Sequence, residues 1–229
     1  MVASPVTFDT KWNDNYDNGQ ANRYPFDCVV SFLYTYYPRN KERKEVRVLE
    51  VGCGTGNNLW FAAREGFSVF GIDGSTTAID YANRRFKDEG LAGEFRVGDF
   101  TERLPVDDAS IDLVIDRNAI THTSKSGGRR AVEEVARVLA PGGHLFFNPF
   151  SDMDSGYASG TAGPDGTRIG LTHGSLATVG QVSYYGRQDM EALFDQRWKW
   201  LALRQITIDD CLTPLVDVRA EWQAVLRRA

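Results

Sequence analysis

The stretch Val48-Leu49-Glu50-Val51-Gly52-Cys53-Gly54-Thr55-Gly56-Asn57-Asn58 decides how this chain folds. Its first half, with Val46 just before it, is apolar and rich in β-branched residues, which is typical of a buried strand. Its second half is a glycine turn, and a helix is expected from Asn57 to about Glu65. Glycine takes backbone angles that other residues avoid, and a helix start offers free N–H groups. The stretch therefore predicts the strand–turn–helix unit with which an open α/β sheet holds a nucleotide-like ligand.

The glycine spacing indicates which ligand this is. Dinucleotide dehydrogenases space their glycines G-x-G-x-x-G, whereas this turn reads G-x-G-x-G from Gly52 to Gly56. The next expected strand, Phe67–Asp73, ends in an acid that can bind a ribose diol. The run E-V-G-C-G-T-G-N, with G-I-D-G-S downstream, resembles the class I S-adenosylmethionine-dependent methyltransferases over roughly Val46 to Phe150. The resemblance implies an α/β, Rossmann-like fold. Its sheet has seven strands, is mostly parallel with an antiparallel last strand, and carries helices on both faces.

Composition restricts the class of protein further. The 229 residues suit a single domain, 1–229, and the net charge of −5 argues against a general nucleic-acid binder. The three cysteines are widely spaced, and no Cys/His pattern indicates a metal site or a disulfide framework. Neither a signal segment nor an apolar run long enough to span a bilayer is found. We therefore expect a cytoplasmic monomer or homodimer that acts on a small molecule, without nucleic acid, membrane or metal.

The rest of the pattern predicts the order of the elements. Residues 1–38 form an N-terminal cap in which a helix runs from Tyr24-Pro25 to Pro38. Further helices are expected over Ser75–Glu89, Gly128–Leu139 and Arg187–Phe194, and further strands over Glu94–Val97, Ile111–Asp116, His144–Phe150, Trp198–Leu203 and Glu221–Leu226. The P-G-G turn at 141–143 is a further mark of the family. The glycine-rich stretch 151–183 has little periodicity, and its length predicts a lid-like loop insertion at the cofactor edge.

The resemblance also implies which residues bind the cofactor, S-adenosylmethionine. The glycine turn and the acid of the second strand are the main binding elements. Asp99 and Phe100 match the positions that bond the adenine amine and pack on its ring. The small Cys53 is interpreted as packing inside the turn and not as a nucleophile. The expected cofactor-binding residues are Tyr16, Arg23, Tyr24, Glu50, Gly52, Cys53, Gly54, Asn57, Asp73, Gly74, Ser75, Asp99, Phe100, Asp116 and Arg117.

Two candidate catalytic residues belong to the family's fourth motif, at the carboxyl edge of the sheet. His122 is the histidine near this edge and is a candidate general base. Asp116 is a candidate to orient an acceptor or to bind the methionyl amine. The leading hypothesis is methyl transfer from S-adenosylmethionine to a small molecule, with release of S-adenosylhomocysteine.

A second hypothesis uses the same fold for different chemistry. S-adenosylmethionine is then itself the substrate: its α-amine attacks its γ-carbon, expels methylthioadenosine and closes an azetidine-2-carboxylate ring. Asn148 would accept from the amine, and Tyr184 or Tyr185 would face the sulfonium. A third hypothesis is a non-catalytic cofactor-binding partner subunit. It is disfavoured because the glycines and Asp73 are all in place.

Overall fold

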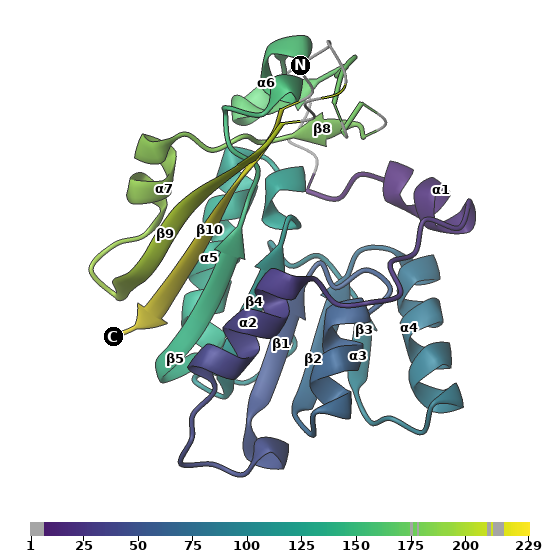
Figure 1. The fold of residues 1–229 in the computed structure, drawn as a ribbon, viewed down its shortest axis with the longest axis vertical. Coiled ribbons are helices and arrows are strands. Elements are labelled where there is room, and N and C mark those ends of the chain that lie inside the picture. The colour runs from purple at the N-terminus through teal and green to yellow at the C-terminus, as the bar shows by residue number, and fades with distance from the viewer. Residues whose placement is uncertain (1–6, 175, 178, 210–211, 213–217) are drawn as a thin grey trace.

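A seven-stranded sheet forms the centre of the molecule in the computed structural model, which describes residues 7–174, 176–177, 179–209, 212 and 218–229 (Figure 1). The strand order is β3-β2-β1-β4-β5-β10-β9. The strands are β1 (Arg47–Val51), β2 (Ser68–Asp73), β3 (Glu94–Val97), β4 (Ile111–Arg117), β5 (Leu139–Asn148), β9 (Trp198–Ile208) and β10 (Arg219–Arg228). The first five pair in parallel, and β10 runs antiparallel to both β5 and β9. The expected fold, a Rossmann-like sheet with a reversed last strand, is confirmed.

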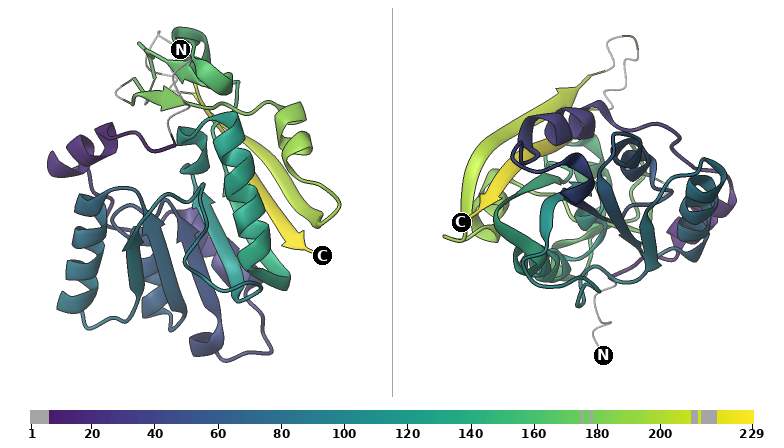
Figure 2. Two further views of the ribbon diagram at one scale, coloured as in Figure 1. Left: turned by 180° about the vertical axis from the view of Figure 1, so that it is seen from behind. Right: turned by 90° about the horizontal axis from the view of Figure 1, so that it is seen from below.

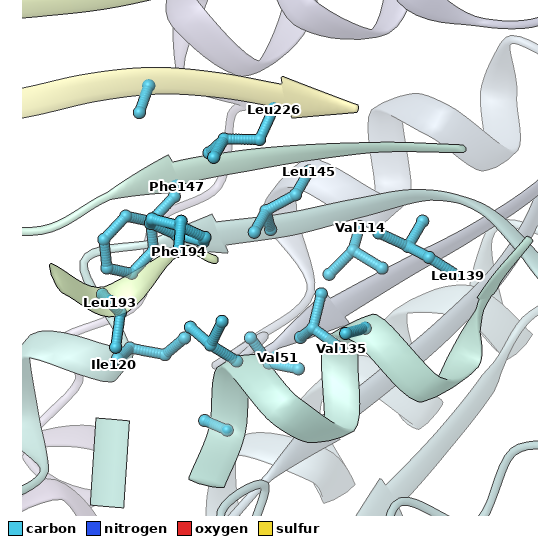
Figure 3. Packing of buried hydrophobic residues seen from close by; sticks show 14 of the residues in the cluster. Val51, Val114, Ile120, Val135, Leu139, Leu145, Phe147, Leu193, Phe194 and Leu226 are labelled. Carbon is cyan, nitrogen blue, oxygen red and sulfur yellow. The ribbon is translucent and has the colours of Figure 1, made fainter. Parts of the chain in front are cut away.

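Helices cover both faces of the sheet, as expected (Figure 2). One face carries α2 (Asp27–Tyr36), α3 (Asn57–Arg64) and α4 (Thr76–Asp88), and the other carries α5 (Lys125–Val138) and α7 (Arg187–Leu193). Each face buries its own apolar cluster, because strands covered on both sides are apolar on both sides. Figure 3 shows the α5 side, where Val135 packs among side chains of β1, β4 and β5.

Two boundaries differ from the sequence prediction for identifiable reasons. Helix α5 begins at Lys125, earlier than expected, because Ser124 caps it: its Oγ accepts the Gly127 N–H at 3.2 Å. Strand β5 begins at Leu139, before the P-G-G turn. Leu139 pairs with Ile111 and His144 pairs with Leu113, so the turn loops out of the strand as an irregularity in the ladder.

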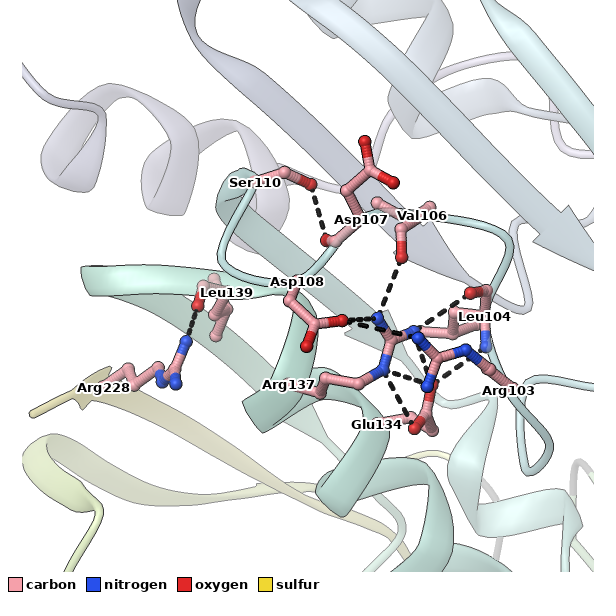
Figure 4. Close-up of polar contacts among 10 residues, drawn as sticks. All are labelled: Arg103, Leu104, Val106, Asp107, Asp108, Ser110, Glu134, Arg137, Leu139 and Arg228. Carbon is pink, nitrogen blue, oxygen red and sulfur yellow. Dashed lines mark hydrogen bonds and ion pairs between the residues drawn. The ribbon is translucent and has the colours of Figure 1, made fainter.

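Arg137 fixes α5 to the loop before β4 (Figure 4). Its guanidinium forms ion pairs with Glu134 at 2.7 Å and Asp108 at 2.6 Å. It also donates to the carbonyl oxygens of Leu104 and Val106, at 3.0 Å and 2.9 Å. One side chain therefore satisfies two main-chain carbonyls and holds this loop against the helix.

The expected lid, residues 151–183, contains regular structure that its sequence does not indicate. It holds α6 (Ser155–Ser159), η3 (Pro164–Gly166) and a three-stranded sheet of β6 (Thr161–Ala162), β7 (Arg168–Ile169) and β8 (Gln181–Val182). A separate apolar cluster lies beneath, built from Phe150, Leu171, Leu176, Val179, Val182 and Tyr184. Residues 175 and 178 lie outside the described residues, as do residues 1–6 of the expected cap. This segment packs as a small layer above the carboxyl edge of the sheet (Figure 1).

Within the described part of the chain, every helix is too short or too polar to cross a bilayer.

Candidate functional site

The turn after β1 passes close to its neighbours because it consists of alternating glycines. Gly52, Gly54 and Gly56 all have positive φ, at +64°, +51° and +74°. A Cβ atom added at Gly52 would lie 2.2 Å from the Ala119 Cβ, and one at Gly54 would lie 2.7 Å from the Tyr16 hydroxyl. Gly52 therefore requires glycine on steric as well as conformational grounds, whereas a Cβ at Gly54 would displace the tip of the Tyr16 side chain.

Asp73, at the end of β2, is tied to the glycine turn by main-chain bonds. Its Oδ2 accepts the Gly54 N–H and its Oδ1 accepts the Ser75 N–H, each at 2.8 Å. The carboxylate is 7% exposed, and burial raises its pKa while the two N–H bonds oppose that shift. The acid that the sequence places at this strand end thus lies against the turn with its carboxylate held in one orientation.

Glu50 is buried beneath the turn and bonds Asn58, whose Nδ2 donates to Oε1 at 2.7 Å. Within the described part of the chain, Glu50 Oε2 has no hydrogen-bond partner. Burial raises the pKa of Glu50 to about 8, helped by nearby Asp116 and Asp73 and opposed by the Asn58 bond and Arg117. Glu50 is therefore mostly protonated at neutral pH and has a free oxygen.

Asn57 and Asn58 attach the N-terminal segment to the glycine turn. Asn57 Nδ2 donates to the Tyr24 carbonyl at 2.9 Å, and Asn58 Oδ1 accepts the Phe26 N–H at 3.0 Å. Asn57 is among the residues expected from the sequence to contact the cofactor, whereas Asn58 is not. A bridging role of this kind depends on where a segment distant in the sequence folds back, and the local pattern carries no signal for it.

Helix α1 (Lys11–Asp17), which the sequence analysis did not predict, lies over this edge of the sheet (Figure 2). Thr77 Oγ1 of α4 donates to Asp17 at 2.8 Å. At the other end, the Trp12 ring meets His122 edge-on with centroids 4.8 Å apart. The helix thus spans from α4 to His122, which lies in the short helix Ile120–His122 after β4.

A cavity of about 410 Å³ lies between α1 and the carboxyl edge of the sheet. This volume is within the range of small-molecule sites. Of the expected cofactor-binding and catalytic residues, those that line it are Tyr16, Glu50, Gly52, Cys53, Gly54, Asn57, Asp73, Gly74, Phe100, Arg117 and His122. The cavity is also lined by residues that the predicted set did not include, among them Trp12, Phe26, Asn58, Phe150, Leu176 and Arg219.

The other expected residues lie outside the cavity lining: Arg23, Tyr24, Ser75, Asp99, Asp116, Asn148, Tyr184 and Tyr185. Tyr24 is 68% exposed, and its ring meets Trp60. Ser75 caps α4, and Asp99 accepts the Thr101 N–H at 2.8 Å. Their suggested contacts with a ligand stay predictions.

Asp116 is fully buried at the end of β4 and shapes the loop that follows. Its Oδ1 accepts the N–H groups of Ala119 and Ile120, at 3.0 Å and 2.9 Å. Burial raises its pKa to about 6, and the main-chain bonds oppose that shift. These bonds hold Ala119 against Gly52, so Asp116 positions the cavity wall from below.

Asn148 and the paired tyrosines belong to the packing around the sheet. Asn148 Nδ2 donates to the Trp222 carbonyl, and its Oδ1 has no partner within the described part of the chain. Tyr185 is buried beside α5, with Lys125 Nζ 3.9 Å from its ring centre, whereas Tyr184 packs beneath the 151–183 layer. Burial raises the pKa of both phenols.

His122 lines the cavity in a form that is neutral at physiological pH. Burial lowers its pKa to about 4, although the Gln181 carbonyl and Asp9 oppose that shift. The ring lies between Trp12 and Phe150, with centroid distances of 4.8 Å and 6.4 Å. The environment of His122 therefore makes it a weak base with an aromatic packing role.

Within the described residues, no group of three or more His, Cys, Asp or Glu side chains is arranged to hold a metal ion.

Comparison with known proteins shows a match to one domain of this chain. Residues 48–143 match the family model for a methyltransferase domain. A probable chloroplastic tocopherol O-methyltransferase from Oryza sativa subsp. japonica is 32% identical over 118 residues, which is 50% of this chain and 32% of that protein. The chain thus spans about a third of the length of this curated relative.

Solved structures share the fold at low sequence identity. The structure reported for the conversion of a disulfide bond into a thioacetal group during echinomycin biosynthesis has a TM-score of 0.69 at 20% identity, covering 96% of this chain and 90% of that one. A SAM-dependent methyltransferase from Methanosarcina mazei has a TM-score of 0.66 at 20% identity, with 86% and 96% covered. Residues 48–143 thus match a methyltransferase domain, and the described chain has the fold of class I S-adenosylmethionine-dependent methyltransferases.

Proposed function

We propose that this protein transfers the methyl group of S-adenosylmethionine to a small molecule and releases S-adenosylhomocysteine. The observation that carries the proposal is the cavity of about 410 Å³, which extends from the glycine turn and Asp73 to an apolar wall at Phe150 and Leu176. One end has the residues that the family uses for the cofactor, and the other offers a surface for a second molecule.

The residues at the first end fit the cofactor. Asp73 presents a carboxylate, held in place by two N–H groups, for the ribose hydroxyls. Gly52 and Gly54 leave the main chain open at the two places where a Cβ would collide with its neighbours. Glu50 Oε2 has no partner within the described residues, and a positively charged methionyl amine beside it would favour the ionised carboxylate that can bind it. Phe100 lines the same cavity and suits the adenine ring.

The bound cofactor would supply a methyl carbon activated by a positively charged sulfur. The chain's own residues orient both molecules and keep water out, and alignment of this kind contributes roughly 7–11 kcal/mol. The aromatic rings of Trp12, Tyr16 and Phe150 line the cavity and offer faces to a cation, worth roughly 0.5–2 kcal/mol each when water is excluded.

The acceptor is one that needs little help from a base. His122 has a pKa near 4 and is a poor proton acceptor at neutral pH. Tyr16 also lines the cavity, but burial and nearby Asp73 raise its pKa, which keeps its phenol protonated. An amine freed of its proton, a carboxylate or an activated hydroxyl fits this site better than a hydroxyl that must be deprotonated there.

Cyclisation to azetidine-2-carboxylate is the alternative, and its expected residues are placed less favourably. Asn148, Tyr184 and Tyr185 are all buried, and none of them lines the cavity. Asn148 Oδ1 lacks a hydrogen-bond partner among the residues that the structure describes, and this favours cyclisation. These placements support methyl transfer as the leading proposal.

Mass spectrometry of reactions with S-adenosylmethionine tests the proposal directly. The protein is incubated with the cofactor alone and with pools of amines, carboxylic acids and phenols. Consumption that requires an acceptor and yields S-adenosylhomocysteine supports methyl transfer. Methylthioadenosine with azetidine-2-carboxylate, formed without an acceptor, overturns it in favour of cyclisation. Binding of S-adenosylhomocysteine without turnover in any pool would favour the non-catalytic subunit.

A further inference from the structure

Two arginines that share a single carboxylate line one wall of the cavity. Arg117 is the last residue of β4, and Arg219 is the first residue of β10. Glu221 Oε2 lies 3.6 Å from Arg117 Nη2 and 3.2 Å from Arg219 Nη2. Its other oxygen accepts from Gln223 Nε2 at 3.4 Å. The group therefore has two positive charges and one negative charge.

The excess positive charge is buried on one side and accessible on the other. The Arg117 side chain is 7% exposed and stacks over Phe26, with its guanidinium carbon 4.1 Å from the ring centre. The Arg219 side chain is 38% exposed. Its guanidinium is therefore the part of this pair that a negatively charged ligand in the cavity can reach.

Within the described residues, the other acids that line the cavity form no ion pair with either arginine. Asp73 is held by two main-chain N–H groups, and Asp9 accepts the Lys11 N–H. Asp116 is buried behind the wall and, with a pKa of about 6, offsets part of the Arg117 charge. The positive charge that a ligand meets is therefore mainly that of Arg219, the more exposed of the two arginines.

Topology separates Arg219 from the ribose-binding end, whereas Arg117, on β4, is only two strands from β2. Strand β10 lies four positions from β2 in the sheet, and neighbouring strands are about 4.8 Å apart. The start of β10 is therefore about 19 Å from Asp73 along the carboxyl edge. Beside Arg219 stands Phe150, with the guanidinium 5.7 Å from the ring centre, and Leu176 continues the apolar surface.

We propose that the methyl acceptor carries a carboxylate on an apolar body, and that Arg117 and Arg219 bind this carboxylate. The inference rests on the proposed function and deepens it. A guanidinium offers paired donors that match a carboxylate, and two of them can bind one anion from two sides. The carboxylate anchors the molecule, and the apolar body lies along Phe150 and Leu176.

Calorimetric titration of matched acids and amides tests the inference. The probes are phenylacetate against phenylacetamide and hexanoate against hexanamide, each with and without S-adenosylhomocysteine. The wild-type protein should bind each acid about tenfold more tightly than its amide. In R219Q this preference should be lost, whereas R219K should retain part of it. The exposed Arg187, which lies outside the cavity, provides the control R187Q with the same change of charge.

The titration of S-adenosylhomocysteine separates the possible outcomes. If R219Q binds it as wild type does while losing the preference for acids, the arginines bind the acceptor and the inference holds. If R219Q weakens S-adenosylhomocysteine binding instead, the arginines bind the cofactor's own carboxylate and the inference is overturned. It is also overturned if the wild type binds acids no better than amides, or if R187Q behaves as R219Q does. A wild-type protein that prefers acids but does not bind S-adenosylhomocysteine would contradict the proposed function alone.

Discussion

Replacing Gly52 by alanine should destabilise the protein and close the cavity, for reasons that can be separated by a control. Gly52 has a φ of +64°, which costs an L-residue about 1–2 kcal/mol. The new Cβ would also lie 2.2 Å from the Ala119 Cβ, so one of two main chains must move. Overpacking of this kind costs about 1–3 kcal/mol more. The expected loss of unfolding free energy is therefore about 2–5 kcal/mol in total.

The matched control is Gly90→Ala. Gly90 has a φ of +65°, nearly the same as Gly52, and nothing lies within 4 Å of an added Cβ. The free energy of unfolding of G90A should therefore fall only by the cost of the backbone conformation, about 1–2 kcal/mol. The assay is urea unfolding followed by circular dichroism, together with calorimetric titration of S-adenosylhomocysteine. G52A should lose affinity while G90A retains it. Equal stability of the two variants would refute the steric reasoning, and full affinity in G52A would refute the placement of the cofactor.

Further predictions concern the buried acids and the cap. The pKa of Glu50 is raised from 4.5 to about 8, so its contribution to stability is complete below pH 4.5 and is lost as the pH rises to about 8. When thermal unfolding is compared at about pH 5 and about pH 9, the wild-type protein should lose up to about 5 kcal/mol of stability relative to E50Q as the pH rises. Equal changes of stability with pH in the two proteins would contradict this. D73N leaves the N–H of either Gly54 or Ser75 without an acceptor, which should cost about 1–3 kcal/mol of stability. Calorimetry should also show weaker binding of S-adenosylhomocysteine, and wild-type affinity would argue against Asp73 as the ribose ligand. W12A removes the ring packed on His122 and should weaken ligand binding by about 0.5–1.5 kcal/mol. Its melting temperature should change little, since no residue of α1 is fully buried, and a large drop would show that α1 is part of the stable core.

The parts of the fold that were predictable from the sequence are those with a local signal. The glycine turn, Asp73 and the alternation of strands and helices follow from backbone conformation and hydrophobic periodicity over short stretches. Because the carboxyl ends of parallel strands meet at one edge, the positions of Gly52 and Asp73 at that edge also follow.

Features that depend on distant segments were not predictable in this way. Helix α1 has no fully buried residue, so its sequence carries little periodicity, and its position comes from contacts with Thr77 and His122. Whether Tyr184 or Tyr185 faces the cavity depends on how residues 151–183 fold back on the sheet. Arg219 lines the cavity because the reversed strand β10 starts at this edge, which only the full topology reveals.

The reversal of β10 also determines where the chain leaves the molecule. Because β10 starts beside the cavity and runs against its neighbours, Ala229 follows it at the opposite edge of the sheet (Figure 1). An affinity tag, a fluorescent protein or a surface linkage joined after Ala229 would therefore extend away from the cavity. Immobilisation through this end should leave the cavity open to ligands. Attachment near α1 would instead place the linkage beside the helix that covers the cavity.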